Sequence, residues 1–168
     1  GLTDESSTLV PFVVKPPAAP PASIVARKIF YNNSGFDGNR ATIDPTVGAG
    51  MDSAAIDTSK SALVTPTSGT VQSTFANWIN VQKGINGIMI DVQDPSPVDP
   101  VAGDFTFFNI GKAGTTSTPV TPAAWSSPPI VLQTTPTRQV RMVFTFADSS
   151  LVNTWLQQRF AGIPASST

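Results

Sequence analysis

The stretch RQVRMVFTFA, residues 138–147, decides the fold class, because its side chains alternate between apolar and polar more regularly than any others in the chain. On an extended backbone its apolar side chains share one face: Val140, Met142, Phe144 and Phe146. The polar side chains of the opposite face are Gln139, Arg141 and Thr145. This period of two residues predicts a β-strand with one face in the core and one face in solvent.

Segments on either side predict more strands. We expect them at residues 26–32, 74–81, 86–92, 105–110 and 130–133. The apolar residues that share a face are Phe75, Ile79 and Val81 in the second of these, and Ile88, Ile90 and Val92 in the third. Residues 105–110 are apolar on both faces, which is typical of a buried central strand. Residues 40–70 are expected to be mostly loop.

The composition favours short strands joined by turns. The chain has 168 residues, with 16 prolines, 12 glycines and many Ser and Thr. A chain of this length suits one domain with a single core. We therefore predict an all-β protein, an antiparallel β-sandwich of jelly-roll-like topology with an extended N-terminal arm. The predicted parts are the arm at 1–23, the sandwich at 24–164 and a C-terminal tail at 165–168.

The last element, residues 151–160, fits two structures. Its apolar residues follow a helical stripe, with Asp148 or Ser149 as N-cap and Gly162 as the stop. As a strand, the segment instead has Val152, Leu156 and Phe160 facing in, and Asn153, Trp155, Gln157 and Arg159 facing out. The periodicity alone leaves both structures open.

The residue types argue against catalysis. The chain has no histidine and no cysteine, and its only glutamate is Glu5. It therefore lacks a side chain that ordinarily titrates near neutrality, a thiolate nucleophile and a tetrahedral zinc site. No aspartate pair is marked as hydrolytic by its spacing, and a serine nucleophile has no evident base. We expect a protein that is not an enzyme.

Charge and hydropathy restrict the partners and the location. The net charge is −1, and the ten basic residues are scattered, so no surface for nucleic acid is expected. No apolar run approaches the ~18 residues that span a bilayer. The chain begins at Gly1 without a signal-like segment, which we interpret as a mature, processed end. A neutral surface rich in Ser and Thr favours a secreted or cell-surface protein.

The N-terminal arm combines an apolar segment with a stiff spacer. The proline-rich run from Pro16 to Pro21 predicts an extended spacer. The apolar residues before it are Leu9, Val10, Phe12, Val13 and Val14. Three interpretations stay open: a linker between domains, a segment that packs on its own domain, and a strand that adds to the sheet of a neighbouring copy.

Aspartates gather in two loop-rich stretches. The first holds Asp37, Asn39, Asp44 and Asp52, and the second holds Asp91, Asp94, Asp99 and Asp104. Calcium prefers hard oxygen ligands of this kind, although neither stretch has EF-hand spacing. The main alternative is that these side chains form Asx-turns and cap strand ends. A structural calcium ion is therefore the one cofactor that the sequence suggests.

The tryptophans suggest a second kind of site. Flat aromatic rings on a β-sandwich can stack against sugar rings, while amide and guanidinium groups bind the hydroxyls. The residues that fit such a platform are Trp125, Trp155, Asn153, Gln157 and Arg159. The competing expectation, which carries more weight, is that Trp78, Trp125 and Trp155 all fill or cover the core.

Several longer strings also resemble a known kind of domain. They are KIFYNNSGFDGN (28–39), AIDTSKSAL (55–63), KGINGIMIDV (83–92), DFTF (104–107) and LVNTWLQQ (151–158). In this order they resemble a domain of unclear function that recurs in large secreted multidomain proteins of planctomycetes and similar bacteria. The resemblance implies an extracellular β-sandwich and favours a strand over a helix at 151–160.

Two functions are consistent with these features. The favoured one is a structural subunit of a cell-surface or extracellular filament, in which residues 9–14 add to the sheet of the next subunit, so the partner is another copy of the chain. The alternative is a non-catalytic carbohydrate-binding module of a secreted protein, whose partner is a polysaccharide.

Overall fold

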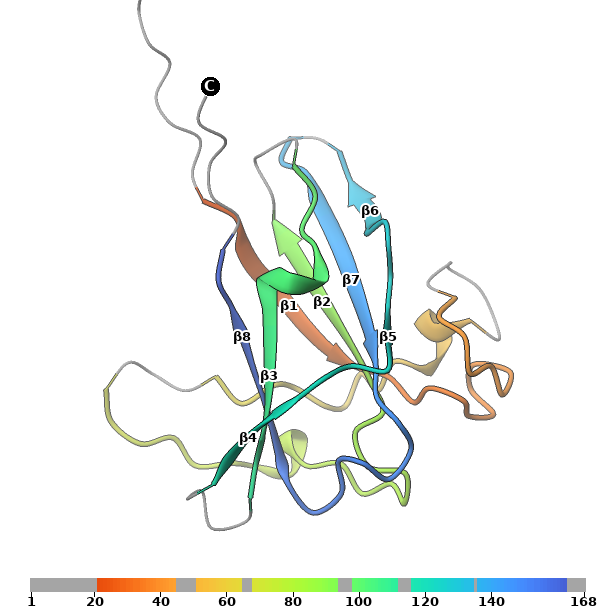
Figure 1. Ribbon diagram of the computed structural model, residues 1–168, viewed down its shortest axis with the longest axis vertical. Coiled ribbons are helices and arrows are strands. Elements are labelled where there is room, and N and C mark those ends of the chain that lie inside the picture. The colour runs from red at the N-terminus through yellow and green to blue at the C-terminus, as the bar shows by residue number, and fades with distance from the viewer. Residues whose placement is uncertain are drawn as a thin grey trace, which may run out of the picture.

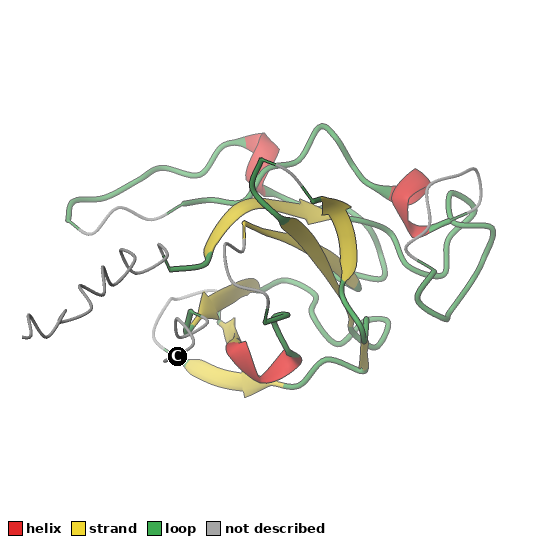
Figure 2. Ribbon diagram, turned by 90° about the horizontal axis from the view of Figure 1, so that it is seen from above, coloured by secondary structure: helices red, strands yellow, loops and turns green. Residues whose placement is uncertain are grey.

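The protein is a sandwich of two antiparallel sheets. The computed structural model describes residues 21–44, 51–64, 68–93, 98–111, 116–134 and 136–162, so arm residues 9–14 and Asp94 lie outside the described part. The first sheet has the order β1 (Ser23–Ile29), β2 (Gly87–Gln93), β7 (Gln139–Thr145), with β5 (Ala124–Trp125) and β6 (Ile130–Gln133) both pairing with β7. The second sheet has the order β4 (Ser117–Val120), β3 (Phe105–Ile110), β8 (Trp155–Phe160). Figures 1 and 2 show the two layers, which confirm the predicted all-β sandwich.

Aromatic side chains join the two sheets. The Phe105 and Phe107 rings of β3 lie edge-on to Phe144 of β7, with centroids 5.2 and 5.0 Å apart. Phe107 also meets Phe146 edge-on at 5.5 Å. Leu156 and Phe160 of β8 pack against the same core, to which β2 contributes Ile88, Ile90 and Val92. The inward faces predicted for β2 and β7 are therefore confirmed.

The outer face of β7 is covered, contrary to the prediction of a solvated face. Arg141, Val143 and Thr145 are all buried. Val143 belongs to a second apolar cluster with Phe30, Ala55 and Met89. The chain that follows β1 and the short helix η1 (Asp52–Ala55) supply this cover, and Phe30 forms a bridge to Ile56. The first sheet is thus buried on both faces at its centre.

The segment 74–81 forms no strand. It contains the short helix η2 (Phe75–Asn77), and Phe75 is 77% exposed. The amide of Thr74 donates to Asn77 Oδ1 at 2.8 Å, which closes a turn in place of strand pairing. A third short helix, η3 (Ala102–Asp104), precedes β3.

The second sheet is buried on one face only. In β3, Phe105 and Phe107 are buried while Thr106 is exposed, so the expectation of a strand covered on both faces is wrong. Residues 155–160 form a strand, as the resemblance favoured. Val152 is exposed, however, and Leu151 takes the inward position, because the chain turns through Asn153 at a φ of +53° before β8 begins.

No helix in the described part of the chain is both long enough and apolar enough to cross a membrane.

Candidate functional site

The outward side of the second sheet carries a row of aromatic and polar side chains. Residues directly opposite each other in an antiparallel pair point to the same side. The register of β3 and β8 pairs Thr106 with Arg159, Phe108 with Gln157 and Ile110 with Trp155. We call the surface formed by Phe108, Trp155, Gln157, Arg159 and the neighbouring Trp78 the aromatic face.

Trp78 and Trp155 form the end of this face. Their ring centroids lie 5.9 Å apart with the planes at 75°, and the two residues are 57% and 36% exposed. The indole N–H of Trp78 donates to Ser73 Oγ at 3.2 Å. The two indole rings therefore pack edge to face, and both remain partly exposed to solvent.

The loop that presents Trp78 is anchored to a second loop. Lys60 Nζ lies 3.9 Å from the centre of the Phe75 ring and donates to the Phe75 carbonyl at 3.2 Å. Asn77 Nδ2 donates to the Ser61 carbonyl at 3.0 Å. These contacts fix η2, and with it Trp78, near the start of β8.

Polar groups lie farther along the same strand. Arg159 donates through Nε and Nη2 to Gln157 Oε1 at 3.2 and 2.9 Å. Its guanidinium carbon also lies 4.6 Å from the centre of the Phe108 ring. This contact fixes the guanidinium plane over the sheet. Arg159 is the only charged residue that the described registers of β3, β4 and β8 place on this side.

The other predicted platform residues lie elsewhere. Trp125 is in β5, opposite Phe144 in the first sheet, and is 46% exposed. Asn153 lies in the turn before β8 rather than in the strand. None of the three tryptophans is buried inside the core, since each is at least one-third exposed; whether they cover it stays a prediction. The sequence reasoning missed the pairing of Trp78 with Trp155 because it treated residues 74–81 as a strand.

No protein-family model matches this chain, and no curated protein or solved structure matches it either. The candidate sites are therefore defined by the geometry of its own residues.

The first group of predicted calcium ligands is divided by the structure. Asp37 and Asp52 are fully buried, whereas Asn39 is exposed. Asp44 forms an ion pair with Arg40, with Nη1 and Oδ2 2.5 Å apart. Burial, and secondarily the charges of Asp37 and Asp44, raise the pKa of Asp52.

The three described aspartates of the second group are each bound by other protein groups. Asp91 accepts two hydrogen bonds from Arg141, Asp99 pairs with Arg138, and the Asp104 carboxylate accepts from the Val101 amide. Within the described ranges, no cluster of three or more Asp or Glu residues is arranged to hold a metal ion.

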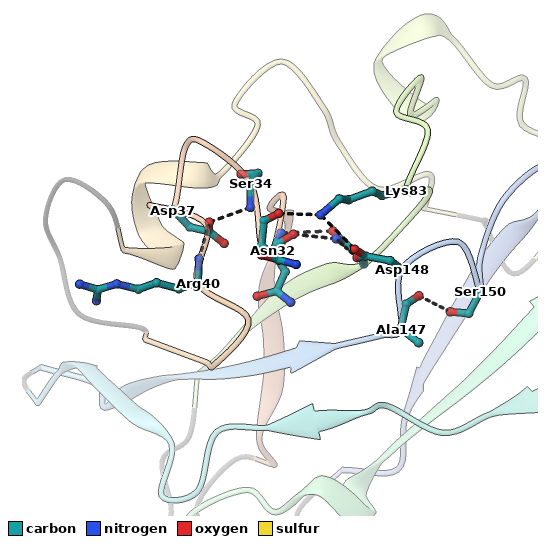
Figure 3. A network of polar contacts seen from close by, with 10 residues as sticks. Asn32, Ser34, Asp37, Arg40, Lys83, Ala147, Asp148 and Ser150 are labelled. Atoms are coloured by element: carbon teal, nitrogen blue, oxygen red, sulfur yellow. Dashed lines mark hydrogen bonds and ion pairs between the residues drawn. The ribbon is translucent and has the colours of Figure 1, made fainter.

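A polar junction holds three loops together near the turn that contains Asp37 (Figure 3). Asn86 donates through Nδ2 to the Asn32 carbonyl at 2.7 Å and to Asp148 Oδ1 at 2.8 Å, and its Oδ1 accepts from the Asn32 amide. Lys83 Nζ contacts Asp148 Oδ2 at 2.9 Å and the Asn33 carbonyl at 2.6 Å. The hydrogen bond from Asn86, followed by that from Lys83, lowers the pKa of Asp148.

Proposed function

We propose that this protein is a secreted, non-catalytic module that binds polysaccharide through the aromatic face. The observation that carries the proposal is the row of Trp155, Gln157 and Arg159 on one exposed side of β8, extended by Trp78. Exposed aromatic rings offer apolar contact to the C–H faces of sugars. The amide and guanidinium groups supply hydrogen bonds to hydroxyls or carboxylates.

The shape of the surface favours an extended polymer over a small sugar. Two hollows in the described part, of about 330 and 510 Å³, are lined by other residues and contain no tryptophan. The aromatic face instead lies on the open side of a sheet. An open row of aromatic and polar side chains suits several consecutive sugar units.

Native affinity electrophoresis tests the proposal. The full chain is run in gels that contain neutral or uronic-acid polysaccharides, and is also mixed with insoluble cellulose or chitin. We expect retardation by at least one polymer, and a loss of affinity of at least about tenfold in Trp155→Ala, because a stacked ring contributes roughly 1.4 kcal/mol or more.

Trp125→Ala is the matched control, because Trp125 is a similarly exposed tryptophan on the other sheet. We expect this variant to bind like the wild type. Loss of binding in Trp125→Ala with retention in Trp155→Ala would overturn the aromatic face as the site. Failure of every polymer to retard the wild type would overturn polysaccharide binding.

Self-assembly through the arm is the second candidate, and the open edges of the second sheet favour it. In the described ranges, β4 and β8 pair only with β3, so each leaves one edge without a strand partner. Such edges expose backbone groups that an added strand from another copy can satisfy. The apolar residues Leu9, Val10, Phe12, Val13 and Val14 are the proposed donor strand.

Light scattering and negative-stain imaging test this candidate on the full chain and on a chain without residues 1–20, which spares β1. We expect the full chain to polymerise and the shortened chain to be monomeric. A monomeric full chain would contradict assembly through the arm.

A further inference from the structure

Two fully buried carboxylates each have one oxygen without a partner among the described residues. Asp37 and Asp52 are both 0% exposed. Asp37 Oδ2 and Asp52 Oδ1 are buried and accept no hydrogen bond. A buried carboxylate oxygen without a partner is costly, because it has lost its water and gained nothing in exchange. The arrangement therefore calls for a positively charged or proton-donating group.

The other oxygen of each carboxylate is fixed by the backbone. Asp37 Oδ1 accepts from the amides of Ser34 and Arg40 at 2.8 and 3.3 Å (Figure 3). Asp52 Oδ2 accepts from the Asp44 amide at 2.8 Å, and the Asp52 amide donates to the Asp44 carbonyl at 3.0 Å. Backbone amides thus hold one oxygen of each carboxylate in place, while the second oxygen of each has no hydrogen-bond partner.

The same loop brings the two side chains into one region. The Arg40 guanidinium contacts Asp44 Oδ2 and Met51 Sδ, which ties the Asp37 turn to the start of η1. The charge of Asp37 acts on Asp52, since it contributes to the raised pKa of that group. A third buried oxygen without a partner, Asn32 Oδ1, lies at the beginning of this loop. Among the described residues, no basic side chain donates a hydrogen bond to Asp37 Oδ2 or Asp52 Oδ1.

We propose that a calcium ion binds to Asp37 Oδ2 and Asp52 Oδ1. Calcium accepts irregular oxygen coordination from loops, with carbonyls and water completing the shell, whereas magnesium requires a near-ideal octahedron. The ligand set differs from the sequence pattern: Asn39 is exposed and Asp44 is neutralised by Arg40, so neither belongs to it. The ion neutralises the two buried charges and fastens the loop to η1.

Calorimetric titration of calcium chloride into the chelator-treated full chain tests the site directly. We expect binding close to one ion per chain, and a rise of about 5 °C or more in the unfolding temperature when EGTA is replaced by millimolar calcium. No binding and no shift in the wild type would overturn the proposal, whatever the variants do.

The variant Asp52→Asn distinguishes a bound calcium ion from a proton shared between the two carboxylates. The new amide keeps an oxygen for the Asp44 amide and can donate to Asp37, so we expect the variant to fold and to be at least as stable as the wild type in EGTA. We also expect it to lose the response to calcium. A variant that keeps the full shift would show that calcium binds elsewhere.

Asp57→Asn is the matched control. Asp57 also lies in a loop near η1, but both of its oxygens have partners, Ser59 and Tyr31. Its calcium response is expected to equal that of the wild type. Loss of the response in this control and not in Asp52→Asn would also overturn the site.

Discussion

At the scale of single residues, the side chain of Asn86 forms hydrogen bonds to two other segments of the chain. Its buried side chain contacts both backbone groups of Asn32 and the carboxylate of Asp148, so three loops meet at one amide. The residues next to Asn86 are also closely packed. A Cβ on the neighbouring Gly87 would lie 2.6 Å from the Phe30 ring, which explains why a glycine follows Asn86.

We predict that Asn86→Ala lowers the free energy of unfolding by about 2–4 kcal/mol, because it leaves the buried Asn32 amide and carbonyl without their partner. Denaturant unfolding followed by circular dichroism measures the loss. Asn77→Ala, in the partly exposed η2 turn, is the control and is expected to cost about 1 kcal/mol or less. Equal losses in the two variants would contradict a special role for Asn86.

The raised pKa of Asp52 predicts that the stability of the folded protein decreases as the pH rises. Its pKa is raised in the folded protein, so the stability that it contributes is full below its ordinary value of 3.8 and is lost as the pH rises through the raised pKa. The charged groups that act on it are Asp37, Asp44 and Arg40. The pKa values of Asp57 and Asp148 are lowered in the folded protein. These two groups therefore change the stability only at acid pH, where the stabilisation that they contribute is lost as the pH falls.

In EGTA we therefore expect the unfolding temperature to fall as the pH rises from the ordinary aspartate range towards neutrality. The chain contains no histidine, so no other side chain ordinarily titrates in this window. Thermal unfolding at a series of pH values measures the effect, which we expect to disappear in Asp52→Asn. A wild type that gains stability over this interval would contradict the prediction.

At the scale of elements, β2 and β7 form the centre of the first sheet and contain a buried ion pair. Asp91 and Arg141 are opposite each other in the register, and Nε and Nη2 of the arginine lie 2.6 and 2.8 Å from the two carboxylate oxygens. Lys28 of β1 adds a longer contact at 3.5 Å. The pair allows charged residues to lie on a face that loops cover.

Arg141→Ala is expected to destabilise the protein by about 3–5 kcal/mol, because it leaves the buried Asp91 carboxylate without its bidentate partner. Arg138→Ala is the control, since Arg138 pairs with the half-exposed Asp99 just before the strand, and we expect a loss of about 1 kcal/mol or less. Chemical denaturation of both variants gives the comparison. A loss below about 1 kcal/mol in Arg141→Ala would contradict the assignment of a buried pair.

The same strands show what the sequence can predict. Alternation in residues 139–145 correctly predicts the strand and its core face, because a period of two arises within the strand itself. Burial of the opposite face depends on Phe30 and Ala55, which lie far away in the chain, so no local pattern reveals it. The sequence predicts only part of the aromatic face, for a similar reason. Trp155, Gln157 and Arg159 lie on one strand, whereas Trp78 lies in a loop that is distant in the sequence.

At the scale of the whole molecule, the strings that carry the resemblance come together. Residues 28–39, 55–63 and 83–92 meet at the polar junction and at the bridge between Phe30 and Ile56. Residues 104–107 and 151–158 contribute to β3 and β8, and the Ile85 amide donates to the Leu151 carbonyl between the two groups. These strings therefore account for much of the framework, while Trp78 and Arg159 lie outside them.

The shared phenylalanine core predicts that the two sheets unfold together. Trp125 reports on the first sheet and Trp155 on the second, so each can be observed alone after Trp→Phe replacement of the other two tryptophans. We expect coincident denaturation midpoints for the two reporters, because Phe105, Phe107 and Phe144 contact one another across the layers. Phe107→Ala, with an expected cost of about 3–5 kcal/mol, should then move both midpoints equally. Separate transitions, or a shift seen by Trp155 alone, would mean that the second sheet and its aromatic face fold as an independent unit.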